Sequence, residues 1–238
     1  MGRGPSIEGR KNAEDARRGK LFTKLIREIT IAARNGADPG TNARLRAGID
    51  KALAGNMTKD TIERAVKRGS GAEGADNMQE LRYEGYGPSG VALIIDCMTD
   101  NQQRTVADVR HALAKHGGNL GTTGSVAFQF HRLGELVFDT TTTGSEDKLL
   151  EAALEAGADD VQSEAGQSTV LCTPEAFEAA KKALVSVGFS PLRADVVWRP
   201  ENRVAVSAEV AETLRDLLDW LEELDDVQEV YHNAALND

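Results

Sequence analysis

The chain has few of the residues that bind metals or cross-link proteins. Its 238 residues include two cysteines and four histidines, and 5% of them are aromatic. Cys97 and Cys172 lie far apart, each within an apolar run, which predicts two buried, reduced thiols and neither a disulfide nor a metal pair. His111 and His116 are five residues apart on a predicted helix, so they point to different faces and cannot ligate one metal as an i, i+4 pair would. We therefore expect no metal site.

Motifs of the common catalytic and membrane classes are also missing. The sequence has no secretory signal, no apolar run of membrane-spanning length, no GxxxxGK[ST] phosphate loop and no nucleophile elbow. Residues 85–90 (GYGPSG) spell GxGxxG, but an apolar run follows at 91–97, which favours a turn between two strands over a dinucleotide site. We expect a cytoplasmic protein that is not an enzyme and that uses no cofactor, no membrane and no small-molecule substrate.

Positive charge is scarce in most of the chain and concentrated at its start. The formal net charge is −10, yet residues 1–70 hold 16 Lys and Arg against 8 Asp and Glu, whereas residues 71–238 hold 12 against 30. This asymmetry is typical of a basic binding segment attached to acidic domains, and it indicates a nucleic-acid partner. The alternative is that the cations merely solvate a small helical bundle.

Residues 19–34 (GKLFTKLIREITIAAR) predict the helix on which this basic segment depends. Apolar residues recur at i, i+3, i+4 and i+7, as on the core-facing side of a helix. They are Phe22, Leu25, Ile26, Ile29 and Ala33. The opposite side carries Lys20, Lys24, Arg27 and Arg34. We expect the apolar face to be buried and the cationic face to be offered to a partner.

Two shorter helices are predicted to complete a three-helix bundle. Thr41 or Asn42 is the N-cap of one that ends at Gly55 and has Leu53 on its inner face, and Thr58 is the N-cap of the other. Their outward cations extend the basic surface. The predicted nucleic-acid-binding residues are Arg10, Lys11, Arg17, Arg18, Lys20, Lys24, Arg27, Arg34, Arg44, Arg46, Lys51, Lys59, Lys67 and Arg68.

The first 18 residues are polar and rich in Gly and Arg, which predicts a mobile arm that becomes helical near Asn12. Basic arms of this kind can order on a polyanion, and a terminus with no such role is the equal alternative. Residues 7–10 (IEGR) spell a protease-cleavage site that is often engineered into proteins. The charge pattern continues smoothly into residues 11–15, which favours a native segment.

Beyond a Gly-rich linker at 70–77 the pattern changes to strands alternating with helices. Residues 134–205 predict a β-α-β-β-α-β unit, the order of a ferredoxin-like domain. A final helix capped by Ser207 and a strand at 227–231 cannot form a domain alone, so they are expected to complete a middle domain. The predicted fold is therefore α+β with three domains: a basic helical domain with its arm at 1–76, a middle α/β domain at 79–133 plus 206–238, and an inserted ferredoxin-like domain at 134–205.

A further strand is predicted at residues 124–130. Val126, Phe128 and Phe130 would then share one face of a sheet. Paired aromatic residues on a sheet can stack nucleic-acid bases. Core packing is the favoured interpretation, because the other residues of an RNA-recognition motif are missing.

Several separate motifs resemble the YebC/PmpR family. They are residues 17–29 (RRGKLFTKLIREI), 42–46 (NARLR), 56–60 (NMTKD), 83–88 (YEGYGP), 117–121 (GGNLG) and 124–126 (GSV). The resemblance covers nearly the whole chain. Many members begin with His-Ser-Lys-Trp, where this chain has Gly-Pro-Ser-Ile at 4–7, so roles of that Trp and His do not carry over.

The resemblance implies three domains with a helical first domain, and a cytoplasmic regulator that is not an enzyme. Bacterial members are commonly described as transcriptional regulators that bind DNA, whereas mitochondrial relatives act as translational activators and the family is linked to stalled ribosomes. Lys and Arg suit phosphates, so DNA and ribosomal RNA both fit the basic segment. A third hypothesis is a scaffold that binds a protein through its ferredoxin-like unit. We expect a monomer.

Overall fold

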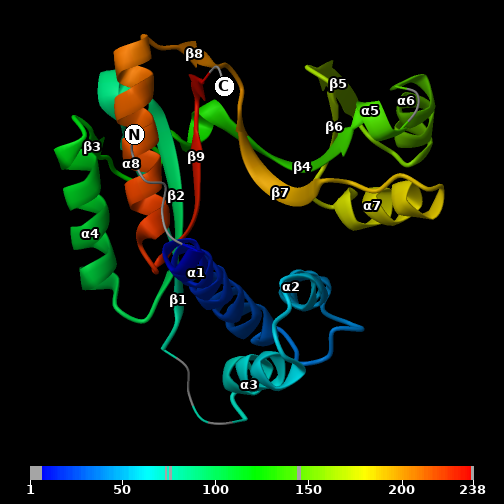
Figure 1. The fold of residues 1–238 in the computed structure, drawn as a ribbon, viewed down its shortest axis with the longest axis horizontal. Helices are drawn as coiled ribbons and strands as arrows, with labels where there is room; N and C mark the ends of the chain where they lie inside the picture. The colour runs from blue at the N-terminus through cyan, green and yellow to red at the C-terminus, as the bar shows by residue number, and fades with distance from the viewer. Residues whose placement is uncertain (1–6, 73, 75–76, 144–145, 237–238) are drawn as a thin grey trace. The chain divides into compact units, whose positions relative to one another are not determined.

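The computed structural model describes residues 7–72, 74, 77–143 and 146–236, with the side chains of 7–13 and 142–143 outside that description (Figure 1). The fold is α+β, as predicted. The chain divides into two compact units, Met1–Thr123 with Val206–Val230 and Gly124–Ala205 with Tyr231–Asp238. The chain thus leaves the first unit and returns to it, the path that an insertion requires. The division into three domains with the predicted boundaries stays a prediction.

Three helices open the first unit. They are α1 (Ile7–Ala33), α2 (Ala43–Ala54) and α3 (Lys59–Gly69). The side chains of Asn42 and Thr58 accept hydrogen bonds from Leu45 N and Thr61 N, which confirms both predicted caps. Buried apolar side chains from all three helices, with Met57 from the turn between α2 and α3, form one core that includes Leu25, Ile29, Leu45 and Ile62.

Two details of this helical region differ from expectation. Helix α1 begins at Ile7, so the segment expected to be a mobile arm is helical from that residue onward. Leu53 is exposed, and Ala52 is buried in its place, because α2 turns a different edge of its apolar stripe to the core than the i, i+4, i+8 spacing suggested. Residues 1–6, and residues 73 and 75–76 of the predicted linker, lie outside the described part of the chain.

A four-stranded sheet forms the rest of the first unit. Its order is β3-β1-β2-β9, from β3 (Asn119–Leu120), β1 (Gln79–Tyr86), β2 (Ala92–Thr99) and β9 (Val227–His232). Helices α4 (Gln102–Lys115) and α8 (Ala208–Glu223) lie side by side along it (Figure 1). Ser207 caps α8, as predicted. Strands β1 and β2 are antiparallel and are joined by the short 3-10 turn η1 (Pro88–Gly90), so GYGPSG is the predicted turn between strands.

His111 of α4 and His116, the C-cap residue just beyond that helix, do not diverge as expected. The rings of His111 and His116 both contact Trp220 of α8, with centroids 5.9 and 5.5 Å from the indole. Two residues five positions apart can flank one large side chain between them, so the prediction of different faces was wrong. Within the described residues, no group of three or more His, Cys, Asp or Glu side chains is arranged to hold a metal ion.

The second unit contains a ferredoxin-like sheet, as predicted. Its antiparallel order is β5-β6-β4-β7, from β5 (Asp160–Glu164), β6 (Gln167–Cys172), β4 (Phe130–Asp139) and β7 (Arg193–Pro200). Helices α5 (Thr140–Thr143), α6 (Glu146–Glu155) and α7 (Phe177–Ser186) connect the strands. Its separate core includes Leu136, Phe138, Leu149, Val170 and Leu184. The short strands β8 (Val204–Ala205) and β10 (Ala234–Ala235) pair in parallel.

The strand predicted at 124–130 is wrong. Residues Ala127–Gln129 form the 3-10 turn η2, and β4 begins at Phe130. Val126 and Phe130 are buried, whereas Phe128 is 73% exposed, so the three side chains do not share a face. Gly124 adopts a positive φ of 87°, a bend that an extended strand does not contain.

Both cysteines are buried free thiols, as predicted. Burial, with the nearby carboxylates of Asp96 and Asp226, raises the pKa of Cys97 to about 12. The thiol of Cys97 is therefore protonated at neutral pH. In the described part of the chain, no helix has the length and apolarity needed to cross a bilayer.

Candidate nucleic-acid interface

The cationic face of α1 lies against the C-terminal end of α8. Lys20 forms an ion pair with Glu223, and its Nζ also lies 3.4 Å from the Glu223 carbonyl oxygen. Lys24 Nζ donates to the Glu222 carbonyl oxygen at 3.1 Å. The last carbonyls of a helix lack intrahelical partners and carry partial negative charge. The two lysines therefore complete the end of a helix whose last turn is itself acidic.

Arg27 enters more deeply than the lysines. Its Nη1 donates to the carbonyl oxygens of Met98 and Asp225 at 2.7 and 2.8 Å and to Asp226 Oδ1 at 2.7 Å. The side chain of Arg27 is 15% exposed. One guanidinium thus ties α1 to the end of β2 and to the loop before β9.

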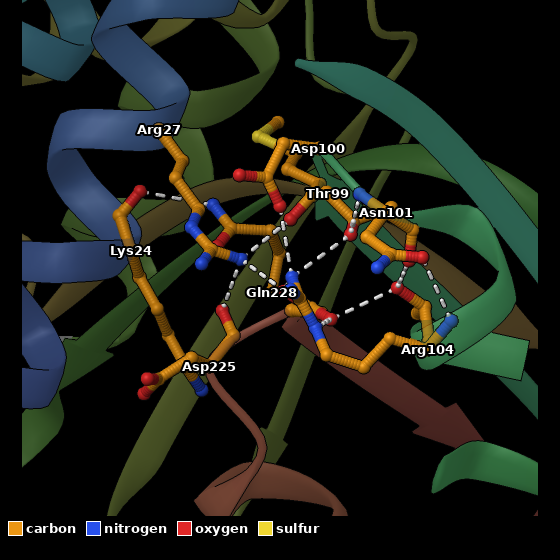
Figure 2. A network of polar contacts seen from close by, with 11 residues as sticks. Lys24, Arg27, Thr99, Asp100, Asn101, Arg104, Asp225 and Gln228 are labelled. Carbon is orange, nitrogen blue, oxygen red and sulfur yellow. Dashed lines mark hydrogen bonds and ion pairs between the residues drawn. The ribbon is translucent and has the colours of Figure 1, made fainter. Parts of the chain in front are cut away.

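Asp226 is the centre of this network, and Figure 2 shows Arg27, Asp100 and Arg104 among its members. Besides Arg27, it accepts from Arg104 Nε and Nη2 at 3.0 and 2.9 Å, in a two-pronged contact, and from Thr105 Oγ1 at 2.9 Å. Its side chain is 7% exposed. Arg104 also donates to Asp100 Oδ1 at 2.9 Å, so residues from α1, α4 and the loop before β9 meet at one buried carboxylate.

The network explains the protonation of its members. Burial alone would raise the pKa of Asp226, but the hydrogen bonds from Arg104, Arg27 and Thr105 outweigh it and lower that pKa. Hydrogen bonds to Asp226 and Asp100 raise the pKa of Arg104. Both groups are charged at neutral pH, and a buried charge that is fully hydrogen-bonded fixes the elements that carry it.

Lys20, Lys24 and Arg27 thus contact the end of α8 and the loop that follows it, and whether they also bind nucleic acid stays a prediction. Their charges are used within the first unit, because the acidic end of α8 and the loop that follows supply nearer partners than solvent does. A cavity of about 610 Å³ next to them is lined by three cations and five carboxylates. Excess negative charge there disfavours a phosphate.

Three more predicted residues are engaged within the chain. Arg44 bridges Glu28 and Glu80, at 2.7 and 2.6 Å. Burial works against its charge, but the hydrogen bonds to the two glutamates prevail and raise its pKa. Arg34 donates to the Met78 carbonyl oxygen, and Arg46 Nη1 donates to the Pro39 carbonyl oxygen at 3.1 Å. The intramolecular contacts of these arginines join helices and loops, and whether the three residues also bind nucleic acid stays a prediction.

The remaining predicted cations with described side chains are exposed. Arg18 lies over the ring of Phe22, with its Cζ 5.3 Å from the centroid, and Lys51 is exposed on α2. Of the predicted residues with described side chains, four have no ion pair, side-chain hydrogen bond or cation–π contact: Arg17, Lys59, Lys67 and Arg68. Arg10 and Lys11 belong to α1, but their side chains lie outside the description. Whether any of these residues binds nucleic acid stays a prediction.

Helix α3 presents three of the four unpartnered cations. It buries Ile62, Ala65 and Gly69 and leaves Lys59, Lys67 and Arg68 on its outer side. Arg64, in contrast, forms an i, i+4 ion pair with Asp60. Lys67 and Arg68 occupy the last turn, where positive charge complements the helix dipole. The described cations of the basic region without such contacts therefore lie on α3 and at Arg17 of α1.

Sequence reasoning missed Asp226, Arg104 and Thr105. Asp226 is separated from Arg104 by 122 residues and from Arg27 by 199, so no local spacing connects them. One local signal was available: Asp226 lies between a helix and a predicted apolar strand, where an acidic residue has little reason to be buried unless it has a partner.

Comparison with known proteins decides the family. A family model described as the TACO1/YebC protein N-terminal domain matches residues 4–72, and another described as the TACO1/YebC second and third domain matches residues 78–234. The chain belongs to the TACO1/YebC family. The two models together cover almost its whole length, which confirms the resemblance drawn from its motifs.

Relatives within the TACO1/YebC family match the chain from end to end. A probable transcriptional regulatory protein of Xanthomonas campestris is 57% identical over 98% of this chain and 97% of its own. A probable transcriptional regulatory protein of Stenotrophomonas maltophilia is 56% identical over 99% and 98%. The crystal structure of a conserved hypothetical protein from Aquifex aeolicus is similar with a TM-score of 0.85 at 42% identity, covering 94% of this chain and 93% of that one.

Proposed function

We propose that this protein is a cytoplasmic, non-enzymatic regulator of gene expression that binds nucleic acid through its basic helical region. The observation that carries the proposal is the outer side of α3, where Lys59, Lys67 and Arg68 are exposed and unpartnered. Cations without internal partners are available to neutralise phosphates and to release their counterions. The names of the relatives from Xanthomonas and Stenotrophomonas favour transcription, and therefore DNA, as the level of regulation.

An RNA partner on the ribosome is the second candidate. Phosphate contacts position a protein without reading sequence, and a DNA reader needs side chains on base edges as well. The exposed residues of α3 are mixed in sign, with Glu63 between Lys59 and Lys67. This pattern fits contacts to the phosphates of a folded RNA better than contacts to base edges in a DNA groove. In this alternative the protein is a monomer that binds ribosomal RNA and regulates translation.

The test compares duplex DNA with ribosomes. Binding to random duplex DNA is measured by fluorescence anisotropy across a salt series, and ribosome binding is measured by co-sedimentation. The Lys59/Lys67/Arg68→Ala variant should lose affinity and should lower the slope of log K against log salt by about 2–3, since each duplex phosphate contact contributes about 0.9. Tight binding to a particular promoter over random DNA supports the transcriptional role, whereas ribosome binding at moderate salt supports the translational one.

A charge-matched control makes this test specific. Arg110, Arg132 and Lys182 are exposed cations outside the helical region, and their triple Ala variant changes the net charge by the same amount. It should bind like the wild type. Equal weakening by both variants would contradict a defined interface on α3, and unchanged binding by the α3 variant would favour the scaffold hypothesis.

A further inference from the structure

Phe128 is unusual among the apolar residues of the second unit. It is 73% exposed, a larger exposed fraction than that of any other large apolar side chain described. The backbone around it is firmly held, because Gln129 N donates to the Val126 carbonyl oxygen at 2.9 Å and Glu201 N donates to the Gln129 carbonyl oxygen at 2.8 Å. An aromatic ring is thus presented to solvent from a fixed turn.

Polar side chains surround a cavity beside this ring. The cavity has a volume of about 280 Å³ and is lined by Phe128, Gln129, Glu201, Asn202, Val204 and Asn233, all within the second unit. The buried Asn233 donates from Nδ2 to Gln129 Oε1 at 3.2 Å, which orients the Gln129 amide and leaves its own NH₂ group as a donor. Asn202 is exposed and has no side-chain partner among the described residues.

We infer that this cavity binds one unpaired nucleobase that carries an exocyclic amino group. The base stacks on Phe128, the amides of Gln129 and Asn202 donate to its ring nitrogen or carbonyl oxygen, and the Glu201 carboxylate accepts from the amino group. A flat ring beside donors and acceptors at its edge is how single-stranded nucleic acid is commonly recognised. Carboxylates accept from the amino group of cytosine in the same way.

The size and charge of the cavity limit its ligand to a single base. Its volume lies near the lower end of small-ligand sites. Glu201 disfavours a phosphate at the cavity itself, while Arg203, exposed next to Asn202 and donating to the Ala234 carbonyl oxygen at 3.4 Å, supplies positive charge beside it. This inference rests on the proposed nucleic-acid function and adds a contact to a base, separate from the phosphate contacts of α3.

The experiment uses the full-length protein and three labelled single-stranded hexamers: oligocytidylate, oligouridylate and an abasic strand of the same length. Wild type should bind oligocytidylate more tightly than oligouridylate, and both more tightly than the abasic strand. Phe128→Ala should weaken oligocytidylate binding by about 5- to 150-fold, the range for losing one stacked base. It should also reduce the preference over the abasic strand. Phe128→Trp should keep the affinity for oligocytidylate and the preference over the abasic strand.

Control variants separate this site from the interface on α3. Leu192→Ala removes an exposed apolar side chain of the same unit and should change nothing. Glu201→Gln should reduce the preference for cytosine over uracil. Lys59/Lys67/Arg68→Ala should preserve the order in which the three strands bind. The inference is overturned if wild type binds no hexamer, if it binds the abasic strand equally well, or if Phe128→Ala behaves as wild type. The α3 interface is tested separately, by the Lys59/Lys67/Arg68→Ala variant.

Discussion

The carboxylate of Asp226 accepts hydrogen bonds from two guanidinium groups and one hydroxyl group, and its backbone is hydrogen-bonded to β2. The Asp226 carbonyl oxygen accepts from Met98 N at 2.9 Å. A buried charge is costly unless it is paired and hydrogen-bonded, and here every partner comes from another element. Asp226 therefore links α1 and α4 to the four-stranded sheet of the first unit.

Replacing Asp226 with Asn should destabilise the protein by about 2–3 kcal/mol. Breaking a buried ion pair typically costs about 3–5 kcal/mol, and the exposed part of Arg104 reduces that cost. Urea unfolding followed by circular dichroism measures the change. Asp100→Asn is the matched control: it removes a partner of the same Arg104, but Asp100 is 59% exposed, so the loss should stay below about 1 kcal/mol. Equal effects would contradict the importance of burial.

The same carboxylate gives the stability a defined dependence on pH. Its folded-state pKa lies below the unfolded value of about 3.9. A depressed pKa contributes stability that is present above the unfolded value and is lost as the pH falls through the folded one. The difference in unfolding free energy between wild type and Asp226→Asn should be constant from pH 7 to about pH 5 and shrink below about pH 4. A difference that persists unchanged at pH 3 would assign it to packing.

At the scale of single elements, local signals predicted helix starts well. Thr58 and Ser207 accept hydrogen bonds from residues three positions on, so sequence contains the whole interaction. The strand predicted at 124–130 failed because an alternating pattern does not state which of its residues reach a core. The contacts of Lys20 and Lys24 with α8 also could not be predicted, since an amphipathic pattern shows that a face is polar but not what covers it.

The contact between α1 and α3 depends on a residue without a side chain. A Cβ at Gly69 would overlap the carbonyl oxygen of Thr30 and meet Ala33. Gly69→Ala should therefore push the helices apart and destabilise the protein by about 1–3 kcal/mol. Gly19→Ala is the control within α1, where a Cβ meets nothing within 4 Å, and it should stabilise by up to about 1 kcal/mol. Thermal unfolding compares the two, and a neutral Gly69→Ala would contradict the close approach of the helices.

At the scale of the whole molecule, each unit has its own core and its own buried carboxylate between two arginines. In the first unit Arg27 and Arg104 hold Asp226. In the second, Arg193 and Arg199 hold Glu135, at 2.5 and 2.7 Å. Stability can then differ between units, because local opening depends on the contacts within each.

Hydrogen exchange should resolve this independence through two reciprocal variants. Asp226→Asn should speed exchange of amides in α1, β2 and α4 and leave β4 and β6 unchanged, because the partners it removes all belong to the first unit. Glu135→Gln should do the reverse, since Arg193 and Arg199 belong to β7. Mass spectrometry of exchange, read peptide by peptide, checks both. Faster exchange throughout the chain in either variant would mean that the two units open together, as one cooperative unit, despite their separate cores.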